Sequence, residues 1–125
     1  MPGEGGEGVR AQGGFTAPVP PDDADLLQRH APGAFAAWLA ASEDVLARRE
    51  LDLATKELVF VVLAVVGGDL AGAKAHAEAG LKAGLTPGMI MEALSIALLS
   101  HGHHIWATAG AALMRHVEAV KGARP

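Results

Sequence analysis

Residues that typically begin or end helices recur along the chain from Asp22 onward, and no pattern typical of a β-strand lies between them. Alanine- and leucine-rich segments carry charged residues at helical spacing, whereas apolar alternation, Asn-Gly turns and tyrosine are absent. A half-buried strand needs alternation with a period of two, while a helix repeats about every 3.6 residues. The pattern therefore predicts an all-α fold: a compact helical domain of about six helices.

Capping residues place the expected boundaries. Asp52 or Thr55 suits the start of the third helix, Gly84 suits a left-handed end of the fourth, and Thr86-Pro87 suits the start of the fifth. Because short apolar runs are ambiguous by periodicity, a buried strand over 58–66 is the alternative to the third helix. We expect helices over residues 23–30, 34–49, 56–66, 69–83, 88–100 and 104–121.

The chain carries more apolar surface than one small domain can cover. It is 50% hydrophobic, and the last two helices and the run Leu58–Val66 contain very few charges. That run is far shorter than the roughly 20 residues that cross a bilayer, so we expect no membrane span. In the second helix, Phe35, Leu39 and Val45 are expected inside. Uncovered apolar helix faces predict a homo-oligomer.

Composition excludes several classes of function. With no cysteine, the chain cannot form disulfides, and a net charge of −4 with scattered Lys and Arg argues against nucleic acid. The start lacks a secretory pattern, which makes the cytoplasm the expected location. Six of the 16 glycines lie in the first 14 residues. We therefore expect a flexible Gly/Pro-rich tail over 1–21 and a single domain over 22–125.

Two residues stand out as an acid–base pair. His76 lies roughly 160° around its helix from the charged stripe of Lys74, Glu78 and Lys82, so it should point inward, on the face that also carries Asp69. Glu57 lies at the start of a helix that is apolar on every side after it. An exposed carboxylate at this place interacts favourably with the positive N-terminal end of the helix dipole. If Glu57 instead faces the core, it must be paired. An inward Glu57 opposite an inward His76 can perform general acid–base chemistry, although a core histidine bonded to a backbone carbonyl is the simpler alternative.

Three of the six histidines lie around an expected helix break at Gly102. His101 and His104 share a face if the helix continues, and imidazole clusters suit divalent transition metals, with His76 as a further ligand. Adjacent His103 and His104 cannot both face one way on a regular helix, so a histidine-lined pocket or subunit interface is the other interpretation. Trp106 is expected as an apolar wall of such a pocket or as plain core.

Three separated segments resemble one family: Leu51–Leu58, Ala75–Thr86 and Ile90–Leu94. Together they are similar to the carboxymuconolactone decarboxylase and alkylhydroperoxidase-D-like family over about residues 35–118. The resemblance implies an all-helical trimer or hexamer with sites near subunit contacts. Glu57 and His76 match the glutamate and histidine of the peroxidase signature, but Asp69 and Gly72 stand where its two cysteines belong. The resemblance therefore excludes a thiol peroxidase and favours the cysteine-less decarboxylase branch.

What the resemblance implies is a cofactor-independent lyase or isomerase, decarboxylase-like, acting on a small carboxylated or lactone metabolite. His76 would be the general acid/base and Glu57 would orient it or share the proton. Substrate-binding candidates are His101, His103, His104, Trp106 and Asp69. The histidine-rich segment departs from the Gly-x-Pro of that branch. A metal-dependent enzyme or metal-binding protein, and a non-catalytic assembly module, are the two alternatives.

Overall fold

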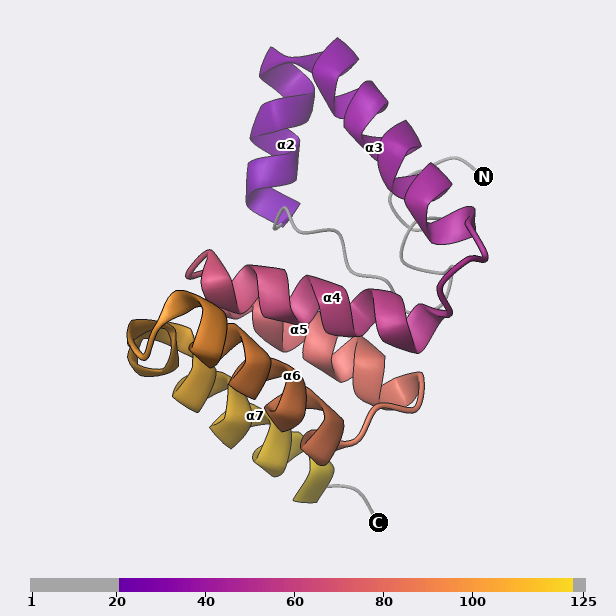
Figure 1. The fold of residues 1–125 in the computed structure, drawn as a ribbon. Coiled ribbons are helices and arrows are strands. Elements are labelled where there is room, and N and C mark those ends of the chain that lie inside the picture. The colour runs from indigo at the N-terminus through magenta and orange to yellow at the C-terminus, as the bar shows by residue number, and fades with distance from the viewer. Residues whose placement is uncertain (1–20, 123–125) are drawn as a thin grey trace. The chain divides into compact units, whose positions relative to one another are not determined.

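The computed structural model describes residues 21–122 and is helical throughout its regular elements, with no strand in that range, which confirms the all-α prediction. The chain divides into two compact units, 1–51 and 52–125. The predicted tail over 1–21 lies almost wholly outside the described residues. In the first unit, the described elements are α2 (Pro21–His30) and α3 (Pro32–Ala47) (Figure 1).

The α3 helix begins with a proline at its N-terminus and has no side-chain cap. Phe35 stacks on Trp38 one turn later, with ring centroids 6.1 Å apart, and Leu39 is half-buried. The prediction that Val45 lies inside is wrong, because Val45 is 44% exposed. Six residues after Leu39, it lies about 120° around the helix from that side chain.

The described part of the second unit, 52–122, contains four α-helices: α4 (Leu53–Val66), α5 (Leu70–Lys82), α6 (Pro87–His101) and α7 (Ala111–Gly122). In Figure 1, α4 runs alongside α5, and α6 runs alongside α7; α4 also contacts α6, and α5 contacts α7. The strand alternative for 58–66 is wrong, since this run forms most of α4. Fully buried side chains from all four helices make the core, including Val61, Val65, Ala73, Ala77, Ile90, Leu94, Leu113 and Val117.

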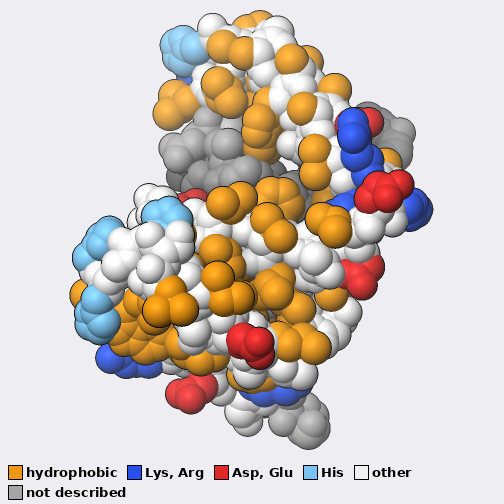
Figure 2. Space-filling model, in the orientation of Figure 1, with side chains coloured by type: hydrophobic (Ala, Val, Ile, Leu, Met, Phe, Trp, Pro, Cys, Tyr) orange, Lys and Arg blue, Asp and Glu red, His pale blue; other side chains and the backbone are white. Residues whose placement is uncertain are grey.

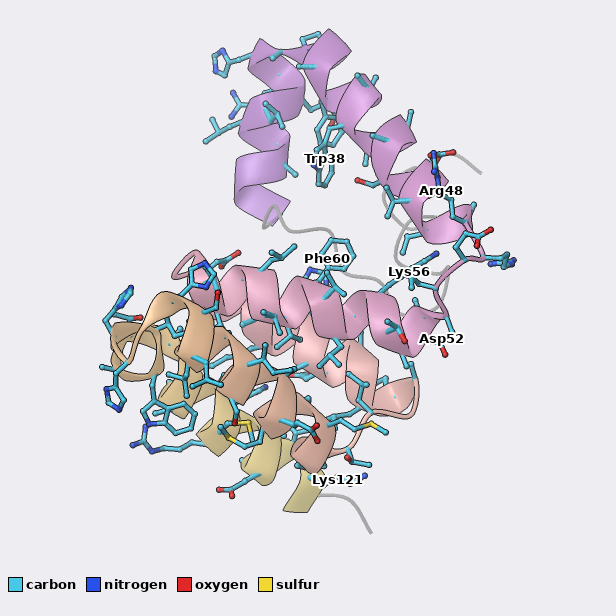
Figure 3. The ribbon with its side chains drawn as sticks, viewed as in Figure 1. Trp38, Arg48, Asp52, Lys56, Phe60 and Lys121 are labelled. Carbon is cyan, nitrogen blue, oxygen red and sulfur yellow. The ribbon has the colours of Figure 1, made fainter. Side chains whose placement is uncertain are left out.

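The predicted capping residues act as expected. Asp52, at the start of α4 (Figure 3), accepts a hydrogen bond from the Thr55 N–H at 2.8 Å, and hydrogen bonds with Thr55 hold the pKa of Asp52 below its usual value. Thr86 caps α6 by accepting from the Met89 N–H. Gly84, at a φ of 114°, turns the chain after α5 in a backbone conformation that side chains disfavour.

The break at Gly102 has a feature that the sequence did not predict. Gly102 has a φ of 96° and ends α6, and the chain then forms a short π-helix, η1 (Trp106–Gly110), that continues directly into α7. Trp106 packs on the core, and a Cβ at Gly110 would lie 2.8 Å from the Trp106 ring. Because Gly110 has no side chain, the Trp106 indole has room beside the π-helix, whose turn is wider than that of an α-helix.

An open apolar groove lies between α4 and α6. Its volume is about 390 Å³, and large apolar side chains around it are unusually exposed, with Leu63 at 62% and Ile96 at 64%. Figure 2 shows hydrophobic side chains gathered on the face where these two helices lie. The groove is lined by Leu58, Val59, Val62, Leu63, Val66, Ala93, Ile96, Ala97, Ser100 and His101. None of the helices described within 21–122 has the length and apolar character needed to cross a membrane.

Candidate functional site

Glu57 and His76 meet inside the second unit. Nδ1 of His76 and Oε1 of Glu57 are 2.7 Å apart, in hydrogen-bonding distance, and the two residues are 2% and 0% exposed. The inward orientation predicted for His76 is confirmed, and of the two orientations considered for Glu57 the structure shows the inward one. The interpretation of Glu57 as an exposed residue at a helix N-terminus is wrong, because Glu57 is fully buried. The structure thus contains a buried carboxylate–imidazole pair.

The packing of α5 on α4 brings the pair together. Gly80 lies one turn after His76, and a Cβ built on it would lie 3.4 Å from Cβ of Glu57 and would clash with a methyl group of Leu85. Ala73 and Ala77, on either side of His76, are completely buried. Because these residues are small, the two helices approach closely enough for a short carboxylate side chain to reach the imidazole.

One oxygen of Glu57 has no partner. Oε2 is buried and accepts no hydrogen bond from the described residues, while Oε1 is bonded to His76. Buried polar atoms in folded proteins are nearly always hydrogen-bonded, and an unsatisfied one costs about 1–3 kcal/mol. Oε2 is therefore a position where an O–H or N–H donor from outside the protein would be stabilised.

Phe60 covers one face of the imidazole. Its ring centroid is 4.6 Å from that of His76 and the ring planes differ by 15°. Phe60 follows Glu57 by three residues on α4, where Figure 3 labels it. Phe60 was not among the predicted site residues, because in the sequence it is one more member of an apolar run. Its spacing from Glu57 was the signal that could have found it.

The arrangement can hold and move a proton. We assign the proton to Nδ1, which then donates to the Glu57 carboxylate and makes Nε2 the unprotonated nitrogen of the neutral ring. A carboxylate that fixes the tautomer and stabilises the imidazolium is a recurring device in general acid–base catalysis.

The histidines around Gly102 are not drawn into this pair. His101, His103 and His104 are exposed, and His101 lines the apolar groove, whose lining includes neither Glu57 nor His76. Among residues 21–122, no three His, Asp or Glu side chains gather closely enough to hold a metal ion. Metal binding by His101, His104 and His76 stays a prediction.

Asp69 and Gly72, which stand where the peroxidase signature has cysteines, form the cap of α5. Oδ1 of Asp69 accepts a hydrogen bond from the Gly72 N–H at 2.9 Å. Asp69 is exposed, and its predicted contact with substrate stays a prediction. Trp106 is half-buried against the core, as the plainer of its two interpretations predicted.

A second His–Glu pair joins α5 to α7. Nε2 of His116 lies 2.6 Å from Oε2 of Glu78, with 26% and 46% of the two side chains exposed. From the sequence, Glu78 was expected only as part of the charged stripe, and no chemical role was predicted for His116. The half-exposed pair provides a natural comparison for the buried one.

Comparisons with known proteins identify the family and the fold. The sequence model of the carboxymuconolactone decarboxylase family matches residues 32–119, and no curated protein matches the chain. Among solved structures, the chain is similar to a proposed carboxymuconolactone decarboxylase from Burkholderia xenovorans LB400, with a TM-score of 0.81 and 21% identity. The similarity covers 98% of this chain and 96% of that chain. At this identity, the likeness concerns the fold.

Proposed function

Because the chain belongs to the carboxymuconolactone decarboxylase family, we propose that it is a cofactor-independent lyase or isomerase for a small carboxylated or lactone metabolite. The observation that carries the proposal is the buried Glu57–His76 hydrogen bond together with the unpartnered Oε2 of Glu57. A proton-transfer pair held away from water, with one acceptor still open, suits chemistry at a carbon next to a carbonyl group.

In the proposed decarboxylation, the bond between the ring carbon and the carboxylate breaks and CO₂ leaves. The electron pair of that bond enters the conjugated system of the lactone and forms an enolate. The His76 imidazolium donates its proton to the far carbon of this enolate, which shifts the double bond and leaves His76 neutral. Water then restores the proton. Glu57 stabilises the imidazolium, and its Oε2 is placed to accept a hydrogen bond from a hydroxyl or enol of the substrate.

Substitution of His76 tests this role, and His116 offers a matched control. The protein is assayed with carboxymuconolactone and a panel of small lactone acids, by CO₂ release and loss of the lactone absorbance. His76→Ala is expected to lower turnover by about 10²–10⁴-fold, and Glu57→Gln to lower it as well. His116→Ala removes a histidine from the half-exposed pair and should leave turnover unchanged. Full activity in His76→Ala would refute the assignment.

The same assays separate the two alternatives. Elemental analysis of protein purified without chelators, followed by assay after chelation, addresses the metal-dependent alternative: activity that disappears with the metal would support it. In the proposed function, the exposed histidines 101, 103 and 104 bind the carboxylate of the substrate. A non-catalytic assembly module would turn over no member of the panel, and native and His76→Ala proteins would bind these compounds equally weakly.

We also propose that the chain forms a cytoplasmic homotrimer or homohexamer through its apolar helix faces. The groove between α4 and α6 supports this, because side chains such as Leu63 and Ile96 are more than 60% exposed around it. Large contiguous apolar surface on a water-soluble chain is typical of an interface between protein molecules.

A further inference from the structure

The groove between α4 and α6 is a concave apolar surface. Its lining contains one ionisable side chain, His101, at the end of α6, and Leu63 and Ile96 are largely exposed around it. If two copies of the chain met groove to groove, the two concave surfaces would enclose a void. A void forfeits the close packing that stabilises an interface, so a convex apolar element fits the groove better than a second groove does.

Among the described helices that do not line the groove, α3 offers an exposed face without charge. From Pro32 to Ser42 it has no acidic or basic residue, and Ala36, Ala37 and Ala40 are exposed. The exposed residues of α2, α5 and α7 include charged ones: Asp25, Arg29, Lys82, Arg115, Glu118 and Lys121. An uncharged helical stretch of about three turns is typically covered by other protein.

The described part of the first unit has very little core of its own. Within residues 24–51, Leu46 is the one buried side chain, and Phe35 and Trp38 are only half-buried. Such a small unit cannot be stabilised by one buried leucine. A contact that covers α3 would supply burial that these helices lack.

The lengths of α3 and the groove are similar. At a rise of about 1.5 Å per residue, the uncharged stretch of α3 is about 15 Å long, and the groove-lining part of α4, Leu58–Val66, is about 12 Å long. The exposed side chains of that stretch are mostly methyl groups, which let the axis of α3 approach α4 and α6 closely.

The charges at the ends of the two surfaces are complementary. Glu43 directly follows the uncharged stretch, is exposed, and lies on the same face of α3 as Ala36 and Ala40. His101 is exposed at the end of the groove. An α3 helix that lies in the groove in the same direction as α6 brings the Glu43 carboxylate to the His101 imidazole.

We propose that the groove binds the α3 helix of a second copy of the chain, with Glu43 beside His101. Each copy has one α3 and one groove, so the contact is heterologous and repeats from copy to copy until the ring closes, as in a cyclic trimer. The inference rests on the proposed homo-oligomer, for which it names the two surfaces that meet.

Cross-linking between two variants tests which surfaces meet. The chain has no cysteine, so Ala36→Cys places a single thiol on α3 and Ala93→Cys places a single thiol in the groove. The two full-length proteins, one of them labelled with heavy isotopes, are mixed, allowed to exchange subunits and treated with a short bismaleimide. Mass spectrometry should show covalent dimers that contain one labelled and one unlabelled chain.

Other pairings of thiols serve as controls. Ala119→Cys, at an exposed position of α7, should form no covalent dimer with Ala36→Cys. Covalent dimers formed by the Ala93→Cys protein alone would show that two grooves face each other, which would overturn the proposal. A chain that carries both Ala36→Cys and Ala93→Cys and links only within itself would also overturn it, because α3 would then occupy the groove of its own chain.

The mass of charged variants separates this inference from the proposed assembly. In light scattering, Ala40→Glu should convert the native oligomer to monomers, because it places an unpaired carboxylate against the apolar groove. Ala119→Glu adds the same charge on α7 and should keep the native mass; circular dichroism checks that both variants are folded. A native chain that is monomeric refutes the assembly and this contact together. An oligomer that survives Ala40→Glu refutes the contact alone.

Discussion

Asp69 and Gly72 depend on each other in the cap of α5. The Asp69 carboxylate accepts from the Gly72 N–H, and it lies so close to Gly72 that a Cβ on residue 72 would collide with it. The three atoms nearest to such a Cβ all belong to Asp69. The cap in this geometry therefore favours a glycine at position 72, which is itself buried.

A double-mutant cycle measures this dependence. Gly72→Ala alone should change the free energy of unfolding little, because the better helix propensity of alanine, about 1 kcal/mol, is offset by displacement of the cap, also about 1 kcal/mol. In an Asp69→Ala background no carboxylate is left to displace, so the same substitution should stabilise by up to about 1 kcal/mol. Urea unfolding of the four proteins gives the coupling. Strictly additive effects would contradict the clash.

The sequence predicted individual side chains where helical geometry alone decides orientation. His76 was placed inside because it lies opposite a charged stripe, and its 2% exposure confirms this. The partnership with Glu57 was only conditional, since residues 19 apart meet through packing that no local pattern encodes. Phe60 was missed for the same reason: its stack on His76 depends on the distance between α4 and α5, not on either helix alone.

At the scale of elements, the separation of α4 and α5 decides whether the buried pair exists. Gly80 lies where α5 packs against α4: a side chain there would meet Leu85, which is 5% exposed, and the Cβ of Glu57. Because Leu85 is enclosed, it has little room to move aside. A larger residue at position 80 must therefore push the helices apart or displace Glu57.

Gly80→Ala should consequently weaken both fold and site. Overpacking of this kind costs about 1–3 kcal/mol, of which the helix propensity of alanine returns about 1 kcal/mol, so we expect a net loss of up to about 2 kcal/mol. The Glu57–His76 hydrogen bond should lengthen, which histidine resonances report. Gly88→Ala is the control, because its Cβ would make only an ordinary contact, 3.7 Å from Thr86 Oγ1. Equal stability of the Gly80→Ala and Gly88→Ala proteins would argue against close packing at position 80.

The order of helices and most of their ends were predictable from caps, whereas the π-helix was not. Asp52, Gly84 and Thr86 act within a few residues of themselves, so their roles can be read locally. The wide turn over Trp106–Gly110 has no such local marker. It depends on how the Trp106 indole packs on the core of the second unit, next to Gly110, which has no side chain to collide with the ring.

At the scale of the whole molecule, part of the surplus of apolar residues noted in the composition lies in the groove between α4 and α6, where Leu63 and Ile96 are largely exposed. Another part lies outside the groove, as at Leu99, which is 91% exposed. Neither helix carries an acidic or basic side chain among the lining residues, apart from His101. A second copy of the chain can cover this surface in two ways: with the same groove in a two-fold contact, or with a different apolar face in a cyclic contact.

Charge placed in this groove should dissociate the proposed oligomer. In a symmetric assembly, Leu63→Glu or Ile96→Glu buries one new carboxylate per subunit without a partner. The free energy that this burial costs is far larger than the free energy that one buried leucine contributes to a subunit contact. Light scattering should give a trimer or hexamer for the native chain and a monomer for either variant. Leu26→Glu, at a residue of the first unit that is 48% exposed, controls for added charge and should keep the native mass. A monomeric native chain would overturn the proposed assembly, and an oligomer that survives both groove substitutions would place its interface on another face.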